Sequence, residues 1–355
     1  MKPKITLTFL LVFIFISHGF GCTTFVLKDA NGNITFGRNF DFPIADGHIH
    51  INYRNMLKTS FIRPPEKPLT WTSKYGSITF NQAGKEFPYG GMNEAGLVIE
   101  QMWLQEAQYP EADARFGLNE LQWIQYQLDN AGTVQEVIDS DSTLRISYMA
   151  TSFLHFLVSD KQGNVATIEY IDGKMLVHRG TNLPYPALAN CEYQHSLDYQ
   201  ASLNTSAVND FNEWTKNSSG RFVKVTELMN EYDNTSNIID YSFRILDSVH
   251  QVNNTQWSIV YDIRNLKIHY KSSLHPSAQR IDFNDIDFSC RSKQLYRPID
   301  AGMDENQAFR ELTFEANLAL MEHVVNGVEF LRNTVPKEYL QASANYYNTL
   351  VCSGD

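Results

Sequence analysis

Cys22 is the residue of this sequence with the clearest capacity for chemistry. It follows two lysines near the start of the chain, an apolar run over residues 5–16, and the small residues Gly19 and Gly21. This order is typical of a secretory signal peptide and its small-x-small cleavage site. The apolar run is too short to span a bilayer, which takes roughly 20 apolar residues. Cleavage after Gly21 would make Cys22 the first residue of the mature chain.

A cysteine at the first position of a chain carries a nucleophile and a base in one residue. The pKa of a free α-amine is about 7.7–8.0 and that of a cysteine thiol about 8.5, so the amine can take the thiol proton near neutral pH. A second interpretation is that Cys22 bears the lipid of a bacterial lipoprotein. Against it, Gly19 occupies the position where lipoprotein signals usually have leucine.

The residues after Cys22 predict the element that must position it, a β-hairpin. Two β-rich runs flank Asn31-Gly32, which is a strong signal for a two-residue hairpin turn. With that turn, Cys22 lies opposite Asp41, whose carboxylate could orient the α-amine. Arg38 then falls on the other face of the sheet. Taken alone, Asp41 could equally cap a turn and Arg38 could be a solvated side chain.

This part of the chain resembles the start of the choloylglycine hydrolases and penicillin V acylases, which are N-terminal-nucleophile hydrolases. The resemblance rests on five matches in family order: Cys22, Arg38 and Asp41 in GRNFDFP, GMNEAGL over residues 91–97, Ala189-Asn190-Cys191, and Gly220-Arg221-Phe222. It implies an α+β fold with four αββα layers. It also implies a signal peptide over residues 1–21, followed by a single domain over residues 22–355.

The resemblance assigns catalytic roles to Cys22, Arg38, Asp41, Asn190 and Arg221. Cys22 would be the nucleophile, Asp41 would orient the amine, and the Asn190 amide would bind the developing oxyanion. The two arginines, if close, would lower the pKa of both the thiol and the amine, since a positive neighbour disfavours the protonated amine and favours the thiolate. The resemblance implies no metal and no organic cofactor.

Asn93 in the GMNEAGL segment and Trp103 are the predicted substrate-binding residues. Trp103 stands where bile-salt hydrolases usually have an asparagine of the oxyanion hole, and a tryptophan there resembles secreted members from Gram-negative bacteria. The indole N–H can donate a hydrogen bond, so Trp103 is either an oxyanion donor or a wall of the pocket. Cys191 stands where relatives often have serine, and the sequence gives it no role.

The implied activity is that of an exported amidase, periplasmic or secreted, which hydrolyses a linear C–N amide bond. Its substrate would be a small N-acyl amide of the penicillin V or acyl-homoserine-lactone type. Hydrolysis of conjugated bile salts is the alternative within the same family. A lipidated protein without catalysis is the alternative from a different class. A homo-oligomer is compatible with all three.

The composition excludes some classes of protein. The 355 residues carry a net charge of −11, and removal of Lys2 and Lys4 with the signal peptide leaves −13. Such a balance argues against a nucleic-acid partner, which favours clustered lysine and arginine. Four cysteines are too few for a disulfide-built scaffold, although Cys290 and Cys352 are plausible disulfide partners in an exported chain. No second long apolar run follows the first.

Hydrophobic periodicity and turn signals place the remaining elements. One helix is predicted over residues 119–130, and a second begins at a capping box formed by Thr133 and Glu136. A third helix is predicted over residues 304–333. Strands are predicted as a three-stranded meander over residues 153–179 and a hairpin over residues 257–270. The polar, asparagine-rich residues 202–237 are predicted to form a loop over the site.

Overall fold

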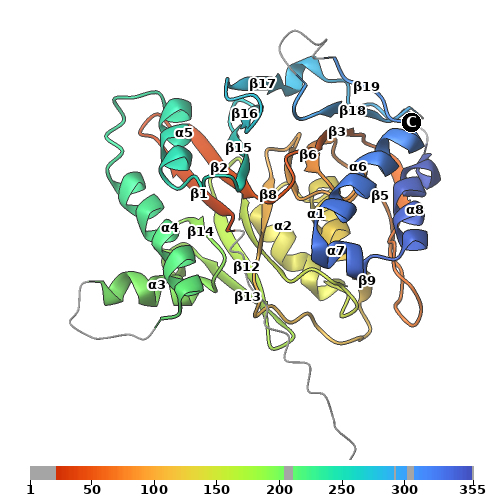
Figure 1. The fold of residues 1–355 in the computed structure, drawn as a ribbon, viewed down its shortest axis with the longest axis horizontal. Coiled ribbons are helices and arrows are strands. Elements are labelled where there is room, and N and C mark those ends of the chain that lie inside the picture. Colours follow the sequence, from red (N-terminus) through yellow and green to blue (C-terminus); the bar gives the residue numbers. More distant parts are fainter. Residues whose placement is uncertain (1–20, 204–210, 292, 302–307, 354–355) are drawn as a thin grey trace, which may run out of the picture.

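The computed structural model describes residues 21–203, 211–291, 293–301 and 308–353 (Figure 1). The predicted signal peptide lies outside these ranges except for Gly21, so it stays a prediction. Within the described part of the chain, no helix is both long enough and apolar enough to cross a membrane.

The first of two central β-sheets carries Cys22 at the start of one of its inner strands. Its strands, in spatial order, are β14 (Ala187–Leu188), β1 (Thr23–Lys28), β2 (Ile34–Asp41), β15 (Thr255–Asp262), β16 (Lys267–Ser272) and β17 (Gln279–Asp282). Each strand is antiparallel to its neighbours. Cys22 directly precedes β1, so neighbouring strands flank it on both sides.

The second central sheet supplies the strand ends that approach Cys22 from its other side. Its strands, in spatial order, are β13 (Lys174–Arg179), β12 (Val165–Ile171), β11 (Leu154–Ser159), β8 (Val98–Trp103), β7 (Gly90–Asn93), β6 (Ser77–Asn81), β3 (His48–Asn52), β18 (Leu295–Pro298) and β19 (Arg310–Glu311). This sheet is also antiparallel throughout its described strands.

Two small sheets lie at the periphery. One contains β20 (Val351–Cys352), β4 (Met56–Thr59) and β5 (Thr70–Thr72), and the other pairs β10 (Leu144–Ile146) with β9 (Phe116–Leu118) in parallel. The disulfide Cys290–Cys352 ties β20 to the segment before β18, with 5.7 Å between the two Cα atoms. This is the pairing that the sequence made plausible.

Helices cover the outer faces of both central sheets (Figure 1). The first sheet is covered by α3 (Tyr193–Ser202), α4 (Glu213–Asn230) and α5 (Ile238–Ser248), and the second by α1 (Glu120–Asn130) and α2 (Val134–Asp139). A C-terminal group contains α6 (Phe314–Gly327), α7 (Glu329–Thr334) and α8 (Lys337–Asn345). Short 3₁₀ turns occur at Ser140–Ser142, Gly180–Asn182, Phe283–Asp285 and Tyr346–Thr349. The layers are therefore helix, sheet, sheet, helix, which confirms the predicted αββα arrangement of an α+β fold.

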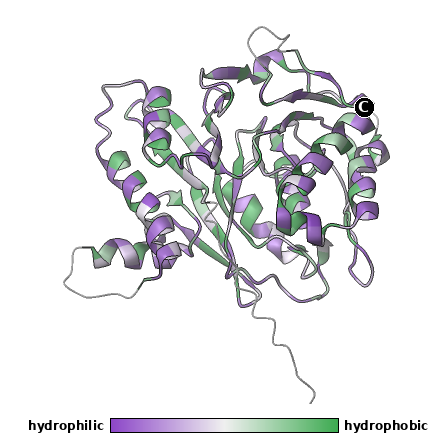
Figure 2. Cartoon of the chain, in the orientation of Figure 1, coloured by the Kyte–Doolittle hydropathy of each residue, from purple (hydrophilic) through white to green (hydrophobic). Residues whose placement is uncertain are grey.

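Burial explains why the central strands lack a clean alternation of polar and apolar residues. Every residue of β2 is buried, because the second sheet covers one of its faces and helices cover the other. The core between the two sheets and under the α4–α5 layer includes Phe25, Phe36, Phe222, Ile245 and Trp257. Figure 2 shows hydrophobic positions along the central strands and mixed positions around the outer helices.

Most predicted elements are confirmed. Asn119 caps α1 by accepting a hydrogen bond from the N–H of Leu121, and the capping box of Thr133 and Glu136 opens α2. The predicted meander is β11, β12 and β13, and the predicted hairpin is β15 and β16.

One predicted segment is wrong, and another is confirmed only in part. The segment predicted as a loop over residues 202–237 contains α4, whose N-terminus is capped by Asn212 and whose apolar positions pack on the first sheet. The predicted helix over residues 304–333 begins only at Phe314, since residues 310–311 form β19; residues 302–307 lie outside the described ranges. His48 and His50 are buried on β3.

The hairpin that follows Cys22 forms, but its register differs from the predicted one. Asp29 pairs with Asn33 through the N–H of Asp29 and the carbonyl of Asn33, 3.1 Å apart, so the loop contains three residues and not two. Gly32 supplies the positive φ of 83° that such a loop requires. The Asp29 carboxylate stabilises the longer loop by accepting a hydrogen bond of 2.7 Å from the N–H of Asn33.

This one-residue difference decides which face of the sheet Arg38 occupies. Thr24 pairs with Arg38, and side chains two residues apart on a strand share a face. Arg38 therefore lies on the same face as Cys22, which corrects the predicted placement on the opposite face. Asp41 pairs with Thr255 of β15 and lies beside Gly21 instead of directly opposite Cys22.

Candidate active site

Cys22 lies at the N-terminal end of β1 with 6% of its surface exposed. Its Sγ is 3.7 Å from Nη2 of Arg38, and its carbonyl oxygen accepts a hydrogen bond of 2.5 Å from Nη1 of Arg221. The thiol and the backbone of the same residue are thus each held by a different buried arginine. A positive charge beside a thiol favours the thiolate, which is the reactive form.

Arg38 is anchored by a buried carboxylate that the sequence did not reveal. The guanidinium forms an ion pair with Glu100 of β8, and neither side chain is more than 2% exposed. The hydroxyl of Tyr261 donates a hydrogen bond to the same carboxylate. A side chain at Gly90 would collide with Glu100, so the close approach of β7 depends on glycine there. The only sequence signal was an acid inside the apolar strand of residues 98–103, a position where acids are rare unless paired.

Arg221 connects α4 to the start of β1. Besides the Cys22 carbonyl, its Nη1 donates to Oγ1 of Thr23 at 2.5 Å, and its Nη2 donates to Oδ1 of Asn190 at 3.1 Å. Burial lowers the pKa of Arg221, and the charge of Asp41 opposes this shift. Arg221 is therefore well placed to hold the segments of Cys22 and Asn190 side by side.

Asn190 follows β14 and is fully buried. Its backbone N–H donates to Oγ of Ser218 at 2.8 Å, and its Nδ2 donates to the carbonyl oxygen of Trp103 at 2.9 Å. With Oδ1 bonded to Arg221, the amide is fixed in one orientation. An amide nitrogen has two N–H groups, so Nδ2 retains a second donor for an oxyanion.

Asp41 lies at the end of β2 and is buried beside the peptide bond that precedes Cys22. Gln251 bridges the two, because its Nε2 donates both to Oδ2 of Asp41 and to the carbonyl oxygen of Gly21, each at 2.7 Å. Thr255 donates to the other carboxylate oxygen. Burial raises the pKa of Asp41, although the hydrogen bond from Thr255 and the charge of Arg221 oppose the rise. The carboxylate therefore stands next to the place where an amine on Cys22 would be.

The structure places Trp103 at the site and Asn93 away from it. Trp103 contacts Asn190 through its backbone carbonyl, and its ring packs edge-to-face on Phe153 with 5.7 Å between the ring centroids. Asn93 donates to the carbonyls of Leu128 and Ala131, and its Oδ1 accepts from the backbone N–H groups of Ala95 and Leu97.

The predicted substrate-binding role of Asn93 is therefore corrected. Its amide nitrogen donates to the end of α1, its amide oxygen accepts from the turn between β7 and β8, and its side chain is fully buried. It serves the fold by closing that turn, and it leaves no polar atom for a substrate.

Two further features are distinct from this cluster. Cys191 is a free, buried cysteine, and burial raises the pKa of its thiol.

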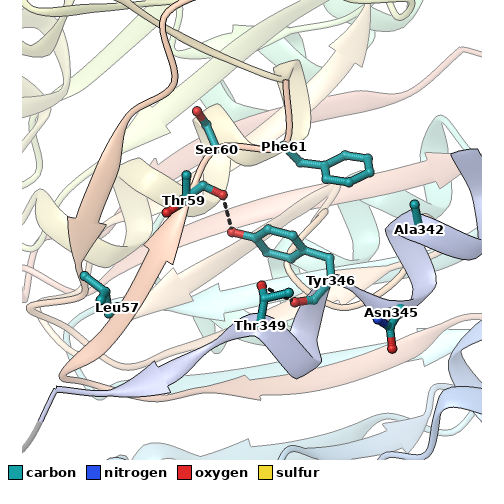
Figure 3. Close-up of a pocket in the computed structure, with 8 residues that line it drawn as sticks. All are labelled: Leu57, Thr59, Ser60, Phe61, Ala342, Asn345, Tyr346 and Thr349. Atoms are coloured by element: carbon teal, nitrogen blue, oxygen red, sulfur yellow. Dashed lines mark hydrogen bonds between the residues drawn. The ribbon is translucent and has the colours of Figure 1, made fainter. Parts of the chain in front are cut away.

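A cavity of about 360 Å³ lies between β4 and the C-terminal helices (Figure 3). Its residues offer no thiol, carboxylate or imidazole: Leu57, Thr59, Ser60, Phe61, Ala342, Asn345, Tyr346 and Thr349. We therefore place the candidate active site at Cys22 and not in this cavity.

Comparisons with known proteins identify relatives of this chain. The model of the linear amide C–N hydrolases, choloylglycine hydrolase family, matches residues 22–296 and so begins at Cys22. A penicillin V acylase from Pectobacterium atrosepticum is 25% identical over 284 residues, which are 68% of this chain and 74% of that protein.

Solved structures are similar over most of their length. A penicillin V acylase from Agrobacterium tumefaciens superposes with a TM-score of 0.68 at 27% identity, covering 82% of this chain and 98% of that one. A variant of conjugated bile acid hydrolase from Clostridium perfringens superposes with a TM-score of 0.63 at 17% identity, covering 80% and 98%. At that identity, the second likeness concerns the fold alone.

Proposed function

We propose that this chain, which belongs to the choloylglycine hydrolase family of linear amide C–N hydrolases, uses Cys22 as an N-terminal nucleophile. The proposal adds to family membership an exported, processed protein and an acyl amide of the penicillin V type as substrate. The observation that carries it is the placement of Cys22, whose thiol faces Arg38 while its backbone is held by Arg221 next to Asn190.

The reaction begins when the α-amine of Cys22, freed by cleavage after Gly21, accepts the proton of its own thiol. The thiolate attacks the amide carbonyl of the substrate and forms a tetrahedral intermediate. The second N–H of the Asn190 amide donates to the oxyanion, a contribution whose loss typically costs about 10²–10³ in rate. Arg38 favours the thiolate, and Asp41 orients the amine.

The intermediate collapses when the protonated amine gives its proton to the leaving nitrogen. The C–N bond breaks, the amine product departs, and the acyl group stays on Cys22 as a thioester. The α-amine then takes a proton from water, whose oxygen attacks the thioester carbonyl. Collapse of this second intermediate releases the carboxylic acid and restores the thiol.

The preferred substrate class is an N-acyl amide with an apolar or aryl acyl group. Two of the relatives reported above are penicillin V acylases. Trp103 and Phe153 place an aromatic pair next to Asn190, where an acyl group would lie during attack by Cys22. Hydrolysis of conjugated bile salts is the second candidate, since a bile acid hydrolase shares the fold.

Export is part of the same proposal. The mechanism needs a free amine on Cys22, and removal of a signal peptide would supply it. A signal peptide over residues 1–21 would deliver the chain to the periplasm or the medium and would free that amine on removal. A lipid on the thiol of Cys22 would instead abolish the nucleophile. The mature N-terminus therefore discriminates an amidase from a lipoprotein without catalysis.

Two measurements test the proposal. Intact mass of the secreted chain should correspond to residues 22–355 with an unmodified cysteine, and a diacylglyceryl mass on Cys22 would exclude the nucleophile. Purified mature protein should release 6-aminopenicillanate from phenoxymethylpenicillin, and Cys22→Ala should release none, with Cys191→Ala as the matched control that keeps activity. Faster release of glycine or taurine from glycocholate or taurocholate would favour the bile-salt alternative.

A further inference from the structure

His155 of β11 forms a buried contact with the backbone just before Asn190. Its Nε2 lies 2.8 Å from the carbonyl oxygen of Ala189, and its Nδ1 lies 3.0 Å from Oε1 of Glu169 on β12. Neither His155 nor Glu169 is exposed. The contact thus links the second sheet to the residue that precedes the oxyanion amide.

Glu169 also holds the other end of the segment that contains Asn190. Its Oε1 accepts a hydrogen bond of 2.9 Å from the N–H of Tyr193, which is the first residue of α3. The residue before α3, Glu192, makes no side-chain cap, so Glu169 supplies the acceptor that this helix start needs. His155 and Glu169 together therefore clamp Ala189–Tyr193 at both ends.

The hydrogen-bond geometry determines the protonation of His155. Ala189 offers a carbonyl oxygen, which only accepts. Glu169 is ionised: burial alone would raise its pKa, but the hydrogen bonds from His155 and from the N–H of Tyr193, with the nearby ring of His178, outweigh burial and lower the pKa to about 2. With acceptors at both ring nitrogens, His155 satisfies both contacts only when each nitrogen carries a proton.

We propose that His155, paired with Glu169, is a protonated positioning residue that fixes the Ala189–Tyr193 segment and thereby the Asn190 amide. The proposal rests on the proposed function, in which that amide binds the oxyanion. The other ionisable groups near this pair are His178 of β13, whose Nε2 is 3.6 Å from Oε2 of Glu169, and Glu192 before α3. A neutral His155 would keep only one of its two bonds, and the connection from Glu169 through the ring to Ala189 would be broken.

The protonation state can be read without any assay of activity. In mature protein labelled with ¹⁵N-histidine at pH 6, both ring nitrogens of His155 should give imidazolium signals, because each faces an acceptor. In Glu169→Gln, His155 should become neutral while Nε2 stays protonated, because the Ala189 carbonyl remains its partner. A neutral His155 in the parent protein at pH 6 would overturn the proposal.

The positioning role is tested by kinetics on a variant that leaves no buried charge unpaired. In the double variant His155→Phe/Glu169→Gln, the ring volume and the acceptor for Tyr193 are kept, but the donor to Ala189 is lost. We expect kcat for phenoxymethylpenicillin to fall about tenfold to hundredfold with KM nearly unchanged, since a displaced oxyanion donor costs less than a deleted one. Alkylation of Cys22 by iodoacetamide needs no oxyanion hole and should proceed at the parent rate.

Two single variants serve as controls. Glu169→Gln keeps the bond from Nε2 to Ala189 and should retain kcat within about threefold. His178→Gln touches Glu169 but not Ala189 and should behave like the parent. A folded double variant whose kcat stays within about twofold of the parent would refute the role of His155. A parent protein that is alkylated at Cys22 yet fails to cleave phenoxymethylpenicillin would instead count against the proposed substrate, and the histidine signals would still decide the proposal.

Discussion

The buried ion pair between Arg38 and Glu100 holds a positive charge beside the thiol of Cys22. A buried pair is costly to break, because removal of one partner leaves the other charge unpaired away from water. Replacing both partners by apolar groups of similar size is much less costly. The stability of the protein and the reactivity of its thiol should therefore respond differently to single and double substitutions here.

Glu100→Ala should lower the free energy of unfolding by about 3–5 kcal/mol, because Arg38 stays buried without its carboxylate. Arg38→Met/Glu100→Leu should recover most of that loss, yet kcat should fall, since no positive charge remains beside the thiol. Urea denaturation measures the first quantity. The pH dependence of Cys22 alkylation measures the effect on the thiol, and an unchanged profile in the double variant would contradict the role of Arg38.

Substitution of Asp41 should change the stability of the protein differently before and after cleavage. Burial raises its pKa above the ordinary value of 3.8, so the unfolded chain loses this proton at lower pH than the folded chain and ionisation favours unfolding at neutral pH. Asp41→Asn should therefore stabilise a chain that retains Gly21 at pH 7, and the gain should vanish below about pH 4 as both states become protonated. Thermal unfolding across this pH range measures the effect.

The mature chain provides the comparison. Its new amine would stand beside Asp41 and favour the ionised carboxylate, so Asp41→Asn should give no such gain there and should lower kcat. An equal stabilisation of both forms would show that the carboxylate and the amine do not interact.

At the scale of elements, the loop between β1 and β2 sets which residues face Cys22. Deletion of Ala30 should leave Asp29 paired with Asn33 across a two-residue Asn31-Gly32 turn, a favoured hairpin loop. The register of Arg38 would be preserved, and kcat should stay within about twofold of the parent. Gly32→Val keeps the loop length but strains a positive φ, so it should cost about 1–3 kcal/mol of stability. Inactivity of a folded Ala30 deletion would contradict this account of the register.

At the scale of the whole molecule, the disulfide Cys290–Cys352 joins the C-terminal strand to a segment 62 residues earlier. Its removal by Cys290→Ser/Cys352→Ser should lower the free energy of unfolding by about 2–4 kcal/mol, chiefly because the unfolded chain gains freedom. Activity at room temperature should be unchanged, since neither cysteine contacts the Cys22 cluster. The change in melting temperature, compared with that of Cys191→Ser, measures the effect.

Most of the predicted helices and strands could be located because caps and turns are local signals, whereas the four layers were implied by the resemblance to a family. Asn119, Thr133 and the turn residues of the meander act within a few positions of themselves. The register at Arg38 was not predictable, because a two-residue and a three-residue loop both suit Asn31-Gly32. The helix α4 was missed because its polar positions dominate the composition of residues 202–237, while the few apolar ones pack on the first sheet.

The site was predictable only where a motif carried it. Resemblance supplied Cys22, Arg38, Asp41, Asn190 and Arg221, and the structure brings all five together. It could not supply Glu100 or His155, whose roles come from partners on strands that are distant in sequence. Asn93 shows the converse, since a motif residue can serve a turn alone.

The packing of Gly21 has a consequence for when the proposed chemistry of Cys22 can begin. In the uncleaved chain, the carbonyl of Gly21 occupies a donor of Gln251, and the nitrogen of Cys22 is an amide with no basicity. The surrounding cluster is nevertheless assembled, so under the proposed mechanism the uncleaved chain lacks only its proton acceptor. If export and cleavage are coupled, the proposed reaction can begin only on the far side of the membrane, where the bond between Gly21 and Cys22 is cut.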